Sequence, residues 1–86
     1  MAAQKQTRRR ASGVCKLFGE RLRTLRKSKQ WTLEELAYRS GLHVTYLSGL
    51  ERGRRNPTLN VITQLADALK ITLSVLFKGF SKGTAL

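Results

Sequence analysis

The sequence has few of the residues that cross-link a fold, bind a metal or carry out catalysis. It contains one cysteine, one histidine and five acidic residues. A lone cysteine forms no internal disulfide, and Cys15 and His43 do not make a metal site between them. We interpret Cys15 as a small, half-buried apolar residue. Because no set of nucleophile, base and orienting group is visible, we expect a protein that is not an enzyme and uses no cofactor.

Long apolar runs are also missing. No stretch approaches the length that crosses a bilayer, and the charged N-terminus is not followed by the apolar segment of a secretion signal. A chain of 86 residues buries one core and has little surface left for a deep cleft. We therefore expect a cytoplasmic protein with no membrane partner and no small-molecule ligand.

Cations are present in large excess. The chain has 17 lysines and arginines against five acidic residues, which gives a net charge of +12. These positive charges repel one another in a folded monomer. Binding to a nucleic acid relieves the repulsion, because lysine and arginine neutralise phosphates and release the counterions condensed on them. The partner is therefore expected to be a polyanion, although charge alone does not separate DNA from RNA or from an anionic membrane.

Part of the positive charge lies in the first twelve residues, MAAQKQTRRRAS. This segment has no acidic residue and almost no bulky apolar side chain, so it has little to bury in return for being ordered. We predict a flexible basic arm over residues 1–12. Its cations are Lys5, Arg8, Arg9 and Arg10.

Apolar residues recur at helical spacing from Val14 to Lys29 and predict the first helix. A second helix is expected over residues 33–40. Thr32 and Glu35 have the spacing of a capping box, Trp31 and Leu36 occupy the positions of a hydrophobic staple, and Gly41 suits a helix end. A new helical pattern begins three residues later.

The third helix is expected over residues 44–52, with Gly53 ending it. Thr58 is placed to cap a fourth helix with an apolar stripe from Leu59 to Leu69, and Thr72 to cap a short fifth helix over residues 73–77. No strand pattern is present. The sequence thus predicts an all-α protein with an arm at 1–12, a domain at 13–78 and a tail at 79–86.

Two short helices joined by a tight glycine turn allow the second helix to enter the major groove of DNA. Specific motifs accompany this arrangement: Leu22, Leu25-Arg26, Thr32, Glu35-Leu36-Ala37, Ser40-Gly41-Leu42, Tyr46-Leu47-Ser48, Leu50-Glu51-Arg52-Gly53, Arg55-Asn56-Pro57-Thr58, Leu65-Ala66, Ala68-Leu69 and Leu76-Phe77. On these residues, the stretch from Phe18 to Phe77 resembles the phage lambda repressor and Cro family, also called the XRE family of helix-turn-helix regulators. The resemblance implies a five-helix, lambda-repressor-like domain of prokaryotic or phage origin that binds double-stranded DNA.

The resemblance also implies a role for the individual residues around the third helix. The residues at base-facing positions are Val44, Thr45, Ser48 and Gly49. A hydroxyl can bond either base type, and valine can pack on a thymine methyl group. The residues expected at the DNA backbone are Thr32, Arg39, His43, Tyr46, Arg52, Arg54, Arg55 and Asn56. The basic arm is expected to follow the backbone or enter the minor groove.

Two departures from the family pattern weaken direct reading of bases. Leu33 stands where a glutamine that touches the DNA backbone is common, and Gly49 replaces a longer polar side chain. Specificity is therefore expected to depend partly on DNA shape, on water or on the arm. The resemblance further implies that Arg26 and Glu51 pair inside the protein, which would give them a structural role.

A homodimer on a pseudo-palindromic operator is expected, because one short recognition helix reads only a few base pairs. The C-terminal end has more apolar area than a small monomer needs, so the dimer contact is placed on Leu73, Val75, Phe77 and Phe80. Repression is the favoured role. Two alternatives stay open: an antitoxin-type interaction module that binds DNA, and an RNA-binding protein.

Overall fold

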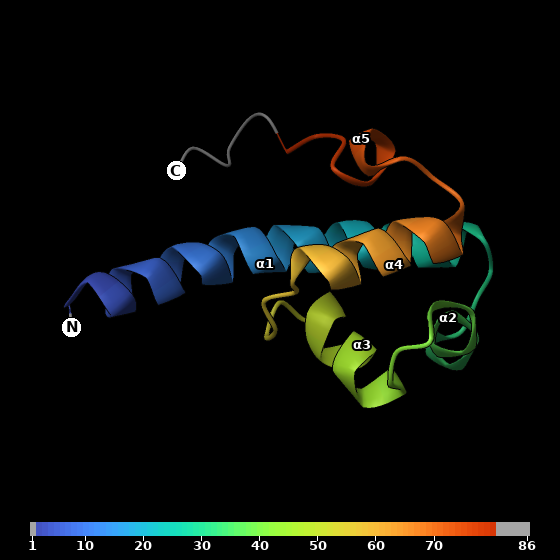
Figure 1. The fold of residues 1–86 in the computed structure, drawn as a ribbon, viewed down its shortest axis with the longest axis horizontal. Helices are drawn as coiled ribbons and strands as arrows, with labels where there is room; N and C mark the ends of the chain where they lie inside the picture. The colour runs from blue at the N-terminus through green and yellow to red at the C-terminus, as the bar shows by residue number, and fades with distance from the viewer. Residues whose placement is uncertain (1, 81–86) are drawn as a thin grey trace.

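The computed structural model describes the backbone of residues 2–80 and the side chains of residues 13–80. Most of the predicted tail, residues 81–86, lies outside the described part. Five helices and no strand are present over residues 2–80: α1 (Ala2–Ser28), α2 (Leu33–Ser40), α3 (Val44–Glu51), α4 (Leu59–Leu69) and α5 (Leu73–Leu76). In Figure 1, α2 and α3 lie on one side of α1, and α5 lies on the other. The all-α, five-helix fold predicted from the sequence is confirmed.

Threonine caps begin three of the helices, as the sequence predicts. The hydroxyls of Thr32, Thr58 and Thr72 each accept a hydrogen bond, 3.1 Å long, from the backbone N–H three residues later. The capping box at α2 is only half formed. The Glu35 carboxylate accepts from Nε of Arg39 at 2.6 Å instead of reaching back to Thr32, because an arginine one turn later offers a charged donor.

The beginning of α1 differs from the prediction. The apolar pattern begins at Val14, whereas the helix begins at Ala2. Alanine, glutamine, lysine and arginine are good helix formers even where no apolar stripe is present, and the single Gly13 does not interrupt the helix. Residues 2–12, predicted to be a flexible arm, are thus a helical continuation of the domain. The other helix ends agree with the prediction within one residue.

The core consists mainly of leucines contributed by all five helices. The fully buried side chains are Leu22, Leu36, Leu47, Leu50, Leu65, Leu69 and Leu76. Helices α2 and α3 have eight residues each, which is too short for either to be stable alone in water. Their position is therefore set by the burial of Leu36, Leu47 and Leu50 against the rest of the core.

Cys15 is buried beside this core and is 6% exposed. Burial raises the pKa of its thiol, because the thiolate loses hydration inside the protein. The thiolate is the reactive form, so Cys15 contributes apolar packing and little nucleophilic character.

Candidate nucleic-acid interface

A glycine turn sets the angle between α2 and α3. Gly41 ends α2 in the left-handed region, with φ of 76°, and its N–H donates to the carbonyl of Ala37 at 2.9 Å. Ser40, buried at the end of α2, accepts from the N–H of Leu42 at 3.3 Å through its hydroxyl. Its carbonyl accepts from the side chain of Gln64 on α4 at 3.1 Å. The turn is thus held by α4 as well, a role for Gln64 that the sequence analysis missed because the partner lies 24 residues away.

Two glycines allow α3 and the residue after its cap to approach α1 closely. A Cβ on Gly19 would lie 2.3 Å from the carbonyl oxygen of Leu50, and one on Gly53 would lie 2.6 Å from Cα of Lys16. Gly53 also has φ of 74°, which favours glycine. The C-terminal end of α3 is therefore seated directly on the backbone of α1.

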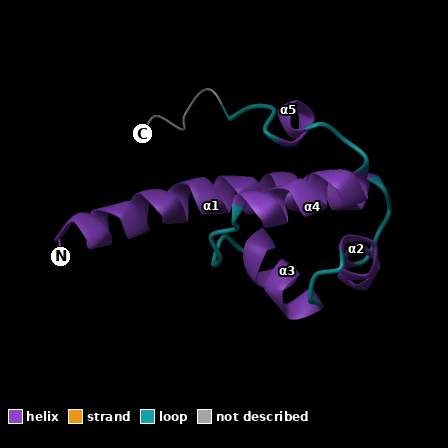
Figure 2. Ribbon diagram, in the orientation of Figure 1, coloured by secondary structure: helices purple, strands orange, loops and turns teal. Residues whose placement is uncertain are grey.

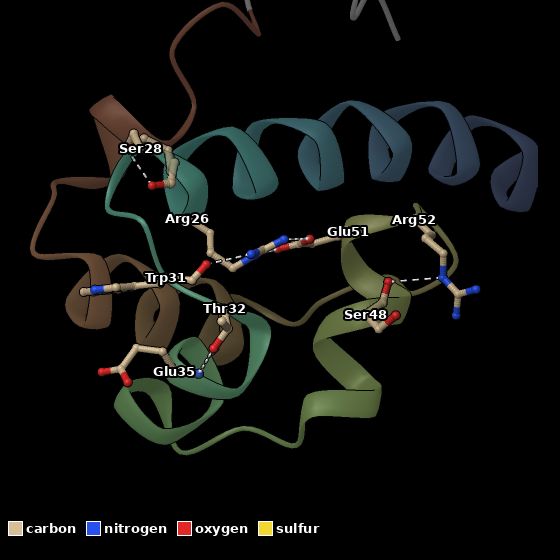
Figure 3. Close-up of polar contacts among 9 residues, drawn as sticks. Arg26, Ser28, Trp31, Thr32, Glu35, Ser48, Glu51 and Arg52 are labelled. Atoms are coloured by element: carbon tan, nitrogen blue, oxygen red, sulfur yellow. Dashed lines mark hydrogen bonds and ion pairs between the residues drawn. The ribbon is translucent and has the colours of Figure 1, made fainter.

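An ion pair fixes the same contact from a second side (Figure 3). Arg26 donates from Nε to Oε2 of Glu51 at 2.7 Å and from Nη2 to Oε1 at 3.0 Å. Its Nη1 donates to the carbonyl of Trp31 at 2.7 Å, so one guanidinium joins α1, α3 and the segment before α2. The pairing implied by the resemblance is present, with side chains only 10% and 6% exposed. The carboxylate raises the pKa of Arg26 above its ordinary value by accepting these bonds.

This anchoring leaves the opposite face of α3 open. His43, Val44 and Thr45 are exposed at its beginning, and Ser48 is partly exposed one turn later. Three of the four residues expected to face bases are therefore accessible. The fourth, Gly49, is buried. The side chain of Arg55 covers it, since a Cβ on Gly49 would lie 3.0 Å from Cγ of Arg55.

The loop that follows α3 is drawn in teal in Figure 2. Its residues, together with the C-cap of α3, include several cations. Arg52, Arg54, Arg55 and Asn56 are exposed. Nε of Arg52 also donates to the carbonyl of Ser48 at 3.4 Å, which holds its stem against α3 (Figure 3). Tyr46 is half-buried, and the guanidinium of Arg55 lies 5.7 Å from the centre of its ring.

The beginning of α2 is a weaker phosphate site than expected. Thr32 is exposed, but Glu34 and Glu35 stand in the first turn and oppose an anion there. Arg39 is paired with Glu35 at 2.6 Å and lies over the ring of Trp31 at 4.4 Å. These contacts compete with a phosphate for Arg39. Trp31 itself is partly buried against the core, in agreement with its predicted position in a hydrophobic staple.

The arm and the C-terminal end also differ in part from expectation. Lys5, Arg8, Arg9 and Arg10 lie in the helical continuation of α1, whose side chains are outside the described set. An α-helix about 10–12 Å wide does not fit a minor groove about 6 Å wide, so the minor-groove placement expected of an extended arm does not suit this conformation. At the other end, Leu73 and Val75 are exposed.

Phe77 and Phe80 are held by the protein's own core. The rings of Phe18 and Phe77 are 5.9 Å apart between centroids, and those of Phe77 and Phe80 are 5.1 Å apart. Arg21 fixes α5 by donating to the carbonyls of Leu76 and Val75 at 3.2 and 2.7 Å. The sequence analysis did not single out Tyr38 and Leu59, which are the most exposed large apolar side chains described.

Residues 22–76 match the model of the HTH_3 helix-turn-helix family. The chain belongs to this family. HTH_3 proteins are DNA-binding transcriptional regulators, and the family resemblance inferred from the sequence motifs is thereby confirmed. Among residues 2–80, no helix is both long and apolar enough to span a membrane.

Named relatives and solved structures agree with this membership. An uncharacterized HTH-type transcriptional regulator, y4dJ of Sinorhizobium fredii, is 49% identical over 57 residues, 66% of this chain and 74% of the relative. The control protein C.BamHI of Bacillus amyloliquefaciens is 43% identical over 56 residues, 64% of this chain and 69% of that protein.

The crystal structure of the restriction-modification controller protein C.AhdI from Aeromonas hydrophila superposes with a TM-score of 0.73 at 46% identity. The match covers 76% of this chain and 98% of that one. The chain spans less than half the length of several other curated relatives.

Proposed function

We propose that this HTH_3 protein binds a specific double-stranded DNA operator as a homodimer and represses transcription. The observation that carries the proposal is the anchoring of α3. Its inner side is held by Leu47, Leu50 and the Arg26–Glu51 pair, while its outer side is open beside a cationic loop. A short helix held in this way projects into the major groove as a rigid unit.

The open face supplies contacts of two kinds. Thr45 and Ser48 offer hydroxyls to base edges, and Val44 offers an apolar surface to a thymine methyl group. Arg52, Arg54 and Asn56 stand where they can bond phosphates and fix the helix in the groove, with His43 at its entrance. Two relatives are named as repressors, the immunity repressor protein of Bacillus phage phi105 and RghR of Bacillus subtilis, and they favour repression here.

Selection of bound duplexes from a random pool tests specific binding. The wild-type protein should enrich one half-site sequence and prefer it to RNA of equal length. Thr45→Ala or Ser48→Ala should change the preference at one position of each half-site by about 1–3 kcal/mol, the range for a good direct contact. Thr63→Ala, on the exposed side of α4, is the matched control and should leave every preference unchanged. An unchanged ranking in the α3 variants, with lower affinity for all duplexes, would show that these hydroxyls do not read bases.

The dimer contact is proposed at α5. Leu73 and Val75 are its exposed apolar side chains, whereas Phe77 and Phe80 support it from the core side. Leu73→Lys combined with Val75→Lys should weaken self-association in sedimentation. In the operator of the wild-type dimer, the two half-sites should lie about 10–10.5 base pairs apart. Leu59→Lys, an equally drastic change at a more exposed leucine, should leave the dimer intact. A double variant that stays fully dimeric would reject this surface.

A further inference from the structure

The contact between Arg55 and Gly49 brings a loop side chain onto the recognition helix. Gly49 is buried within α3, and its Cβ position is 3.0 Å from Cγ and 3.5 Å from Nε of Arg55. The side chain of Arg55 thus occupies the space that a side chain at position 49 would enter. Arg55 is nevertheless exposed, so its guanidinium is accessible from outside.

Two further contacts hold Arg55 in this place. The backbone N–H of Arg54 donates to the carbonyl of Gly49 at 2.9 Å, which ties the loop to α3 at the residue before Arg55. The guanidinium carbon of Arg55 lies 5.7 Å from the centre of the Tyr46 ring, within the range of a cation–π contact. The stem and the head of Arg55 are therefore both supported by α3.

The position of Gly49 on the helix decides where the guanidinium is presented. Residues three and four apart are neighbours on a helix surface, so Tyr46 and Thr45 both border Gly49. Thr45 is exposed at the beginning of α3. Arg55 consequently lies beside the same open row that we propose to enter the major groove.

We propose that Arg55 reads a guanine in the major groove, as the long side chain that α3 itself lacks at position 49. The inference rests on the proposed function. Arginine pairs through two parallel hydrogen bonds with O6 and N7 of guanine, whereas Val44, Thr45 and Ser48 are too short for a two-pronged contact. Support of the side chain by Gly49 and Tyr46 lowers the entropy lost when Arg55 binds.

Gly49 has a specific part in this arrangement. Glycine within a helix is unfavourable, and here it leaves the room that Arg55 fills. A methyl group at position 49 would push against the flexible side chain of Arg55 rather than against backbone, so the fold should tolerate alanine. Gly49→Ala should therefore not lower the melting temperature, and yet it should displace the side chain of Arg55.

The test is duplex selection with matched arginine variants. Arg55→Ala should lose its preference for one G·C pair in each half-site by about 5- to 150-fold. Arg55→Lys keeps the charge but not the planar fork, so it should lose most of the same preference. Arg54→Ala, which removes the neighbouring exposed cation, should weaken binding evenly across sequences.

Coupling between the two positions completes the test. Gly49→Ala should reduce the preference at the same base pair as Arg55→Ala, and it should add nothing further when Arg55 is already alanine. A uniform loss of affinity in Arg55→Ala, equal to that of Arg54→Ala, would overturn the proposal and assign Arg55 to the phosphates. If the wild-type protein enriches no duplex at all, the proposed function itself fails. If the wild-type protein enriches a site and Arg55→Ala keeps the same preferences, only the role of Arg55 fails.

Discussion

At the scale of single residues, the Arg26–Glu51 pair should matter most for stability. Both side chains are almost fully buried, and Arg26 also bonds the carbonyl of Trp31. Removing one partner leaves the other charge buried without compensation, so Glu51→Ala should lower the free energy of unfolding by about 3–5 kcal/mol in urea titration. Arg26→Met combined with Glu51→Leu removes both charges and should recover much of this loss.

The control is the exposed pair of the same chemistry. Arg39 and Glu35 approach to 2.6 Å, but their side chains are 43% and 39% exposed. Glu35→Ala should cost about 1 kcal/mol or less, because solvent screens the attraction. Equal losses in Glu51→Ala and Glu35→Ala would contradict a special role for the buried pair.

Sequence reasoning at this scale succeeds where a contact is local. The three threonine caps depend on residues three positions apart, and all three are present. Sequence reasoning fails where the side chains around a residue come from another segment of the chain. Helical spacing assigns Gly49 to the outer face of α3, but the loop brings Arg55 over it. The placement of Arg39 over the ring of Trp31, eight residues earlier in the chain, is likewise not indicated by helical spacing. The pairing of Arg39 with Glu35 is different, because it joins residues four apart on one helix and belongs to the local contacts.

At the scale of helices, the packing of α1 on α3 leads to a prediction about two glycines of the same helix. A Cβ on Gly19 would lie 2.3 Å from the carbonyl oxygen of Leu50 and 2.5 Å from that of Glu51, and both neighbours are backbone. Gly19→Ala should therefore force α1 and α3 apart. It should lower the free energy of unfolding by about 1–3 kcal/mol, as overpacking does, even though alanine is the better helix former.

Gly13 provides the matched control in α1. Nothing lies within 4 Å of its Cβ position, so Gly13→Ala should instead raise the free energy of unfolding by about 0.5–1 kcal/mol. Thermal or urea unfolding of the two variants side by side makes the comparison. Stabilisation by both substitutions would show that α1 and α3 are not in close backbone contact.

Helix boundaries were predictable where caps and apolar spacing coincide. The predicted bounds of α2 agree with the structure, because Thr32 and Gly41 mark both of its ends. The beginning of α1 was not predictable from apolar spacing, since residues 2–12 are helical without a buried stripe. The close approach of α1 and α3 through Gly19 could not be predicted either, because it depends on the crossing of two helices that are separated in the chain by α2 and its flanking turns.

At the scale of the whole molecule, the N-terminal part of α1, residues 2–12, contains cations and no acidic residue. Figure 1 shows this part extending beyond the other helices. At about 1.5 Å per residue, residues 2–12 span about 17 Å as a helix. Gly53 lies against Lys16 of α1, so the basic loop after α3 and the beginning of the extension are at the same end of the molecule. A duplex bound at α3 is therefore within reach of the extension.

We predict that the extension binds the phosphate backbone and not base edges. Each phosphate neutralised on duplex DNA contributes about 0.9 to the slope of log affinity against log salt, so deletion of residues 1–12 should lower that slope by about two to four. Replacement of Lys5, Arg8, Arg9 and Arg10 by alanine keeps the length and the helix propensity and should have the same effect. Since a helix is too wide for the minor groove, the affinity should fall evenly for A·T-rich and G·C-rich flanks. A loss confined to A·T-rich flanks would show that the segment enters the minor groove as an extended chain, and an unchanged slope would show that it takes no part in binding.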